Sequence, residues 1–168
     1  IKDCNEAFKL NPQYDRAFQL RAKAYQHKGD IDRAILDFTE AIHSNPKFAE
    51  LYINRGNAYK EKGDVDKAIF DFMDAFRLNP QLTEPYVCLG EVYLKKDELD
   101  AAIDNYSAAL KLNPQHITAY TGRGLAYERK GDFDKSIADY TSAIRLGVLE
   151  RERNPALMRD GAPPAKRT

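Results

Sequence analysis

The sequence is short of the residues and runs that mark several large classes of protein. It contains no tryptophan, only two cysteines and two methionines, and its lysines and arginines balance its aspartates and glutamates, so the formal net charge is zero. Two cysteines do not make a disulfide framework, and a balanced charge gives no general affinity for nucleic acid or an anionic membrane. No apolar run approaches the roughly 20 residues of a membrane-spanning helix. We expect a cytoplasmic protein with neither nucleic acid nor membrane as partner.

Residues suited to catalysis or metal binding are few and scattered. An enzyme needs a nucleophile, a base and an orienting group that converge, whereas His27, His43 and His116 have no metal-ligand spacing. Gly122 and Gly124 lack the third glycine and the preceding strand of a dinucleotide-binding motif. We therefore predict that the chain is not an enzyme and that it has no catalytic residue, cofactor or metal.

What the sequence does contain is an internal repeat. The dipeptide Asn-Pro recurs at a spacing of 34 residues, at Asn11-Pro12, Asn45-Pro46, Asn79-Pro80 and Asn113-Pro114. A period of this length is the sequence mark of a stacked-repeat architecture. In such a solenoid each repeat buries its apolar face only against its neighbours.

The unit 49–82 shows the expected structure of one repeat. Tyr52, Gly56 and Tyr59 lie on one stripe of a first helix. Gly63 can take the left-handed conformation that ends this helix, and Asp64 is suited to capping the next one. Proline then ends the second helix, because it costs roughly 3 kcal/mol inside one. Each unit is therefore predicted to be a helical hairpin.

Large rings and small residues recur at fixed places of the unit. Glycine in a helix interior costs about 1 kcal/mol relative to alanine, so Gly56 suggests a place where another backbone comes close. We interpret the rings as knobs and the small residues as holes. The small slot holds Ala22, Gly56, Gly90 and Gly124, and the ring slots hold Phe18, Tyr52, Tyr86 and Tyr120, then Tyr25, Tyr59, Tyr93 and Tyr127, then Phe38, Phe72, Tyr106 and Tyr140.

This order of aromatic, small residue, tyrosine, Gly-Asp, alanine, aromatic, alanine and proline resembles the tetratricopeptide repeat. The resemblance implies an all-α, right-handed α-solenoid of antiparallel hairpins. It covers four units, at residues 15–48, 49–82, 83–116 and 117–150. Residues 1–14 match the second helix of a truncated repeat, and 151–168 are expected to form a basic, proline-containing, disordered tail. Because Ile1 falls inside an expected helix, we interpret the chain as a piece of a longer protein.

The third and fourth units depart from the pattern at their ends. Asp97 stands where the other units have the turn glycine, and aspartate tolerates the left-handed region better than most residues. In the fourth unit Gly147-Val148 replaces Asn-Pro, and we expect the glycine alone to end that helix. The last hairpin is expected to expose an apolar stripe.

Arginine and aspartate recur together 16 residues apart. The pairs are Arg21 with Asp37, Arg55 with Asp71 and Arg123 with Asp139. In the third unit both members change, to Leu89 and Asn105. Because the two slots face each other across an antiparallel hairpin, we predict an ion pair within three repeats and none in the third. Such a pair specifies register more than it adds stability.

The resemblance also implies a binding surface, because first helices line a concave groove in this family. A protein or peptide segment would lie along it, with amides and charges fixing its register. The family's clamp for chaperone carboxylates is not expected, since Glu84 and Cys88 stand where it needs basic groups. The predicted groove residues are Arg16, Gln19, Lys23, Asn54, Asn57, Lys60, Glu91, Lys95, Thr121 and Glu128.

Two alternatives to a peptide-binding scaffold stay open at this point. The chain could be the substrate-selecting or regulatory arm of an enzyme whose catalytic domain lies outside it. It could also self-associate through uncovered end hairpins.

Overall fold

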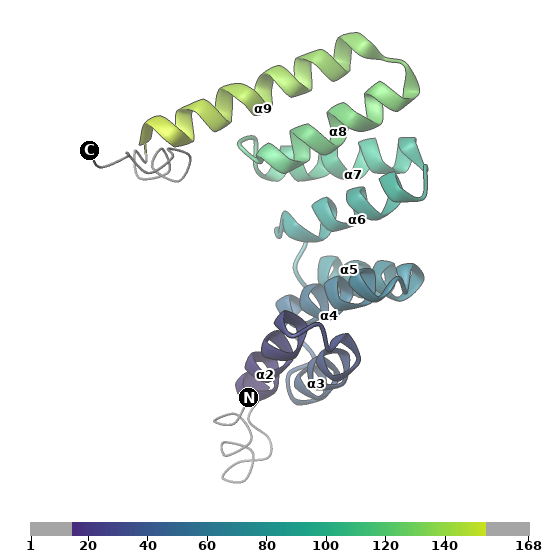
Figure 1. Ribbon diagram of the computed structural model, residues 1–168, viewed down its shortest axis with the longest axis vertical. Coiled ribbons are helices and arrows are strands. Elements are labelled where there is room, and N and C mark those ends of the chain that lie inside the picture. Colours follow the sequence, from purple (N-terminus) through teal and green to yellow (C-terminus); the bar gives the residue numbers. More distant parts are fainter. Residues whose placement is uncertain (1–14, 154–168) are drawn as a thin grey trace, which may run out of the picture.

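The computed structural model describes residues 15–153, which form eight helices. They are α2 (Asp15–His27), α3 (Ile31–Ser44), α4 (Ala49–Lys62), α5 (Val65–Leu78), α6 (Glu84–Lys95), α7 (Leu99–Leu112), α8 (Ile117–Lys130) and α9 (Phe133–Arg153). Each odd-numbered helix packs on the even-numbered helix before it, as an antiparallel hairpin. The hairpins follow one another along the long axis from α2 to α9 (Figure 1). The predicted all-α solenoid of hairpins is confirmed.

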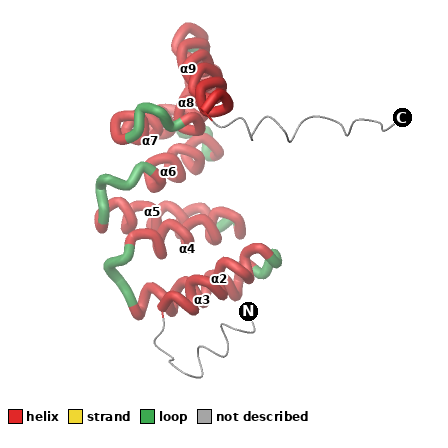
Figure 2. Tube along the Cα trace, turned by 90° about the vertical axis from the view of Figure 1, so that its left-hand side faces the viewer, coloured by secondary structure: helices red, strands yellow, loops and turns green. Residues whose placement is uncertain are grey.

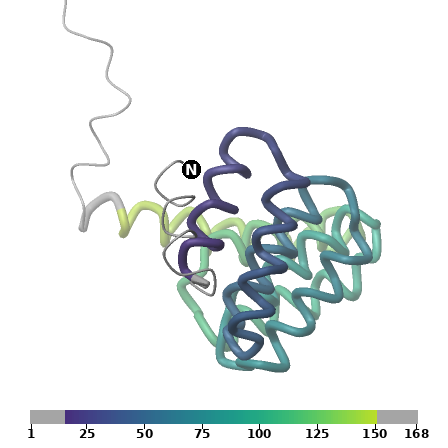
Figure 3. Tube along the Cα trace, turned by 90° about the horizontal axis from the view of Figure 1, so that it is seen from below, coloured from purple at the N-terminus to yellow at the C-terminus, as the bar shows by residue number. Residues whose placement is uncertain are grey.

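Hairpins stack in chain order. Figure 2 shows them as successive layers, and Figure 3, seen from below, shows later helices lying behind earlier ones. Between layers, each second helix contacts the first helix of the next hairpin, and first helices also contact each other, α4 with α6 and α6 with α8. Helices α4, α6 and α8 therefore form a continuous wall along one side of the stack, and side-chain hydrogen bonds from Gln19 and Gln26 join α2 to it.

The turns inside the hairpins take the expected left-handed conformation, but the expected cap by Asp64 is wrong: it stands at the N-cap of α5 without a side-chain hydrogen bond to the helix backbone, and its carboxylate accepts from Lys67 Nζ instead. Gly29, Gly63 and Gly131 have φ values of 77°, 91° and 81°, in the left-handed region. Asp97 takes the same place in the third hairpin with a φ of 60°, as predicted from its position. In each hairpin the second helix begins two residues after this turn residue and returns antiparallel to the first.

Rings of the second helices form the core between the layers. Phe38, Phe72 and Tyr106 are almost completely buried. The small slot is explained differently from our expectation: a Cβ added to Gly56 would lie 2.7 Å from Phe72 Cε1, and one added to Gly90 would lie 2.7 Å from Tyr106 Cε1. What comes close to the glycine is therefore a ring of the same hairpin and not another backbone.

The last helix does not end where the sequence predicted. Gly147 lies inside α9, which continues to Arg153, so the expected glycine cap is wrong. Without the proline of the earlier units, only glycine's modest helix penalty of about 1 kcal/mol opposes continuation. The truncated repeat at 1–14, with Cys4, and the tail from residue 154 onward lie outside the described residues.

Candidate functional site

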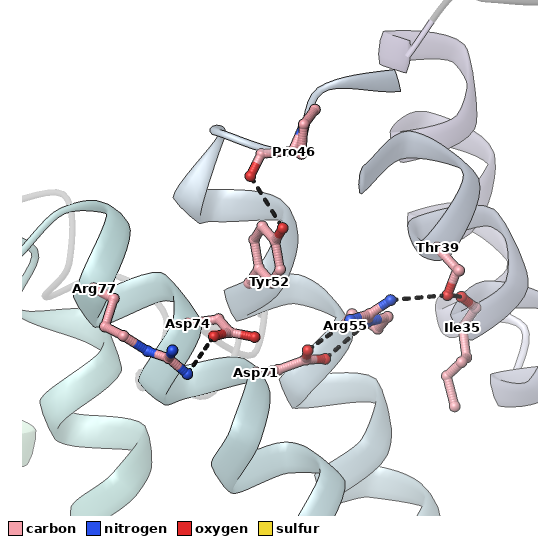
Figure 4. A network of polar contacts seen from close by, with 8 residues as sticks. All are labelled: Ile35, Thr39, Pro46, Tyr52, Arg55, Asp71, Asp74 and Arg77. Carbon is pink, nitrogen blue, oxygen red and sulfur yellow. Dashed lines mark hydrogen bonds and ion pairs between the residues drawn. The ribbon is translucent and has the colours of Figure 1, made fainter. Parts of the chain in front are cut away.

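The predicted ion pairs are present in three hairpins. Arg55 Nε and Nη2 donate to Asp71 Oδ2 and Oδ1 at 2.9 and 2.7 Å (Figure 4). The corresponding distances are 2.6 and 2.6 Å for Arg21 with Asp37, and 2.7 and 2.8 Å for Arg123 with Asp139. The bidentate geometry fixes the register of the two helices in each hairpin.

A third residue of this arrangement was missed from the sequence. Arg55 Nη1 donates to Thr39 Oγ1 at 3.1 Å, which links the ion pair to the preceding hairpin (Figure 4). Arg123 Nη1 donates to Ser107 Oγ at 3.0 Å in the same way. This contact could have been predicted from the sequence, because a residue with a hydroxyl group stands 16 positions before each of these two arginines.

The third hairpin replaces all three members of the arrangement together. Met73, Leu89 and Asn105 occupy the slots of Thr39, Arg55 and Asp71. Leu89 is buried, and Asn105 Nδ2 donates to the carbonyl oxygen of Ala101 at 2.8 Å. Slots 89 and 105 thus hold neither charge of the pair, and the Asn105 amide bonds within its own helix.

The ion pairs belong to the packing between helices. The Arg55 guanidinium carbon lies 5.8 and 5.9 Å from the ring centroids of Tyr52 and Tyr59. Burial raises the pKa of the Asp71 carboxyl, and the hydrogen bonds from Arg55 oppose that rise. The same hydrogen bonds raise the pKa of Arg55. Both groups are held by the rings and by each other rather than directed into solvent.

The wall of first helices is joined by polar contacts between neighbours. Gln19 Nε2 donates to Glu50 Oε1 at 3.5 Å, across from α2 to α4. Lys60 Nζ forms an ion pair with Glu91 Oε2 at 2.6 Å, across from α4 to α6. Further along, Arg129 Nη1 donates to the carbonyl oxygen of Leu94 at 3.0 Å. We call this surface the inner wall, formed by α2, α4, α6 and α8.

Two hollows open on the inner wall near the N-terminal ends of its helices. The larger, of about 560 Å³, lies between α4 and the start of α6. We call it the α4 hollow; it is lined by Lys47, Phe48, Ala49, Glu50, Ile53, Asn54, Asn57, Leu78, Asn79, Leu82 and Glu84. The smaller, of about 410 Å³, lies one hairpin earlier, and we call it the α2 hollow; it is lined by Arg16, Gln19, Asn45, Phe48 and Leu51.

Seven of the predicted groove residues come together around these hollows and the contacts beside them. Arg16 and Gln19 line the α2 hollow, and Asn54 and Asn57 line the α4 hollow. Lys23 Nζ lies 3.6 Å from Glu50 Oε1, at the edge between the two. Lys60 lies one helical turn beyond Asn57 on α4 and meets Glu91 of α6.

The remaining predicted residues are less closely grouped. Lys95 is exposed at the end of α6. Thr121 Oγ1 donates to the carbonyl oxygen of Ile117 on its own helix at 3.0 Å. Glu128 Oε2 accepts a hydrogen bond from Tyr140 Oη at 2.8 Å, within the last hairpin. The structure thus gathers the predicted groove residues of α2, α4 and α6 more closely than those of α8.

The apolar lining of the α4 hollow was missed from the sequence. Phe48, Leu78 and Leu82 come from loops and a helix end rather than from the family's groove positions. The signal that could have found them is a large apolar residue at the last place of two successive units, Phe48 and Leu82.

Cys88 is a buried free thiol. Burial raises its pKa to about 12. Its Sγ lies 3.6 Å from Asn57 Oδ1 and 3.9 Å from Glu84 Oε1, so the thiol donates toward polar groups of the wall. A thiol with this pKa is not a nucleophile near neutral pH.

Two other kinds of feature are absent from residues 15–153. No helix there is both long and apolar enough to cross a bilayer. No three histidine, cysteine, aspartate or glutamate residues in that range gather as ligands for a metal ion.

Similar proteins agree with the geometry of the hairpins. The family described as "TPR repeat" matches residues 22–63 and 90–131, and "Tetratricopeptide repeat" matches 49–82 and 117–146. Among curated protein sequences there is no significant match.

Solved structures with the same arrangement include a crystal structure of MamA. It is 27% identical, with a TM-score of 0.81, over 89% of this chain and 87% of that one. MamA from Desulfovibrio magneticus RS-1 is 19% identical, with a TM-score of 0.78, over 90% of this chain and 84% of that one.

A further neighbour is the APC/C hetero-tetramer Cut9-Hcn1, 20% identical, with a TM-score of 0.77. That match covers 85% of this chain and 28% of the other. Stacked hairpins, the recurring rings and the family matches lead to one assignment: the chain belongs to the tetratricopeptide repeat family.

Proposed function

We propose that the chain is a scaffold that binds a protein or peptide segment along its inner wall. The observation that supports this most directly is the pair of adjoining hollows on α2, α4 and α6. They lie on one wall, and polar side chains of both signs surround them. Tetratricopeptide repeat proteins generally mediate protein–protein interactions, and the Cut9-Hcn1 neighbour is itself an assembly of two kinds of chain.

The charge of the inner wall should control binding of a partner. Affinity capture with the intact chain as bait is compared with capture by the variants Lys23→Glu and Glu91→Lys. We expect partners to be retained by the intact chain and lost, by about tenfold, from each variant, as for charges at an interface. Helicity measured by circular dichroism should not change.

Two controls separate recognition from damage to the wall. The swap Lys60→Glu with Glu91→Lys keeps an ion pair between α4 and α6 but inverts its direction, and it should still lose the partner. Glu40→Lys and Lys111→Glu reverse exposed charges on second helices and should retain it. Equal capture by all these baits would contradict the proposed role of the inner wall.

Self-association is a second candidate, supported by the exposed end of the stack. Ile35 and Ile42 of α3 are 9% exposed, because the next hairpin covers them. At the same places of α9, Ile137 is 63% exposed and Ile144 is 68% exposed. This face of α9 has the apolar character of an internal layer and could receive a first helix of a second copy.

Replacing that apolar face should abolish self-association. We expect the mass measured by light scattering to rise with concentration for the natural chain and to stay monomeric for Ile137→Lys with Ile144→Lys. Leu36→Lys with Phe70→Lys is the matched control, since both residues are similarly exposed but lie elsewhere, on α3 and α5. A monomeric natural chain at every concentration, or equal effects of the two pairs, would exclude this route.

A further inference from the structure

We propose that the α4 hollow is an anchor site for an apolar side chain that stands beside a lysine or arginine in the bound segment, and that Asn54 donates a hydrogen bond to the segment's backbone. This inference rests on the proposed function and names the chemistry of its ligand. Three independent features of the hollow carry it: its apolar wall, an unpaired donor and its charge.

The apolar wall explains the side chain. Phe48 and Leu78 are among the exposed large hydrophobic residues of the chain, and both face the α4 hollow, where they meet the buried Ile53. Leu82 adds a fourth apolar side chain. At about 560 Å³ the hollow falls in the range of ligand pockets, roughly 300 to 1,000 Å³. It can therefore take one aliphatic or aromatic side chain together with adjoining backbone.

The unpaired donor explains the backbone contact. Asn54 Nδ2 is shielded from solvent and has no hydrogen-bond partner, alone among the buried side-chain nitrogen and oxygen atoms of residues 15–153. Leaving a buried donor unpaired is unfavourable, and native proteins rarely do so. Asn54 also lines the hollow. The Asn54 side chain as a whole is only half-buried. A rotation of its amide toward the hollow would bring Nδ2 to a carbonyl oxygen of a bound segment, which would satisfy this donor.

Charge around the hollow favours a basic neighbour. Glu50 and Glu84 stand in its lining against a single cation, Lys47. Glu50 already faces Lys23, whereas the contact of the Glu84 carboxylate within the wall is with the thiol of Cys88. A lysine or arginine of the segment could therefore pair with Glu84. A free C-terminal carboxylate would meet the wrong sign of charge.

The α2 hollow provides an internal comparison. One unit earlier, Arg16 and Gln19 occupy the places of Glu50 and Ile53. Its lining has the cation Arg16 and no carboxylate, and it shares Phe48 with the α4 hollow, whose lining has Glu50 and Glu84. The chemistry of the α4 hollow is therefore a property of this one repeat and not of the fold.

The test is a selection of phage-displayed random 12-residue peptides on the full chain. Enriched peptides are synthesised with amidated ends, and their affinity is measured by fluorescence anisotropy. We expect enrichment of leucine, isoleucine, methionine or phenylalanine within two residues of lysine or arginine. Glu84→Lys should weaken binding about tenfold, and Asn54→Leu about fivefold, as for loss of one hydrogen bond.

Asn54→Leu should change the stability of the free chain in the opposite direction to its affinity for the peptide. Because it removes an unpaired buried donor, it should raise the thermal midpoint of the free chain while lowering its affinity for the peptide. A variant that merely damaged the fold would lower both. Glu40→Lys on α3, an exposed charge reversal away from the wall, should leave affinity unchanged.

The outcomes separate the two proposals. Peptides whose binding depends on Lys23 but not on Asn54 or Glu84, or whose enriched residues are acidic, overturn the anchor site and leave inner-wall binding intact. A selection that yields no peptide dependent on any wall residue overturns both.

Discussion

Replacing Arg55 alone by leucine is expected to lower the free energy of unfolding by about 2 to 4 kcal/mol. The side chain of Asp71 is only 5% exposed and that of Arg55 17%. Removing the arginine leaves a buried carboxylate without its partner, which is the costly way to break such a pair, about 3 to 5 kcal/mol when burial is complete. Urea denaturation followed by circular dichroism measures the change.

The chain contains its own rescue for that variant. The third hairpin replaces the arrangement by Met73, Leu89 and Asn105 and packs without an ion pair. We therefore expect Thr39→Met, Arg55→Leu and Asp71→Asn together to recover most of the lost stability, because no buried charge remains and the amide can bond to its own helix. If the triple variant is as unstable as Arg55→Leu, the lost stability does not come from the stranded carboxylate.

These ion pairs also show why the repeat makes the fold predictable. A spacing of 16 residues between arginine and aspartate is weak on its own, but the joint loss of both in one unit ties them to each other. Each unit repeats the same hairpin, so the residue types found at one position can be compared across several units of a single sequence. The hairpins, their turns and the ring columns could be predicted for this reason.

The α4 hollow could not be predicted in the same way. Its lining draws on three successive units, from Lys47 to Glu84, and the spacing of the repeat does not say how their ends meet. Phe48 and Leu82 share a slot with His116, so the period alone does not identify them as lining residues. The unpaired state of Asn54 Nδ2 depends on what its neighbours fail to offer, which no spacing reveals.

The end of the chain shows a different limit. The glycine cap predicted at Gly147 failed because glycine permits a left-handed turn without requiring one. In the earlier units proline enforces the end of the second helix. Gly147 has no proline directly after it, so nothing at this place forces the helix to end. The helix therefore continues to Arg153.

Gly122→Ala is expected to destabilise the stack by about 1 to 3 kcal/mol, the usual range for overpacking a core. A Cβ at this position would lie 2.3 Å from Tyr106 Cζ and 2.6 Å from its hydroxyl oxygen. The ring has little room to withdraw, because it also packs against Gly90, where an added Cβ would lie 2.7 Å from Cε1, and it is almost fully buried. Tyr106 thus packs against two glycines, one on α6 and one on α8.

Gly147→Ala is the matched control, since it makes the same change inside a helix with no atom within 4 Å of the added Cβ. It should raise stability by up to about 1 kcal/mol, the difference in helix propensity. Thermal and urea midpoints of the two variants should therefore move in opposite directions. Tyr106→Phe should not rescue Gly122→Ala, because the clash begins at Cζ, before the hydroxyl. If both glycine variants are stabilised, α6 and α8 can separate enough to release the ring, and the close fit between these layers does not hold the stack together.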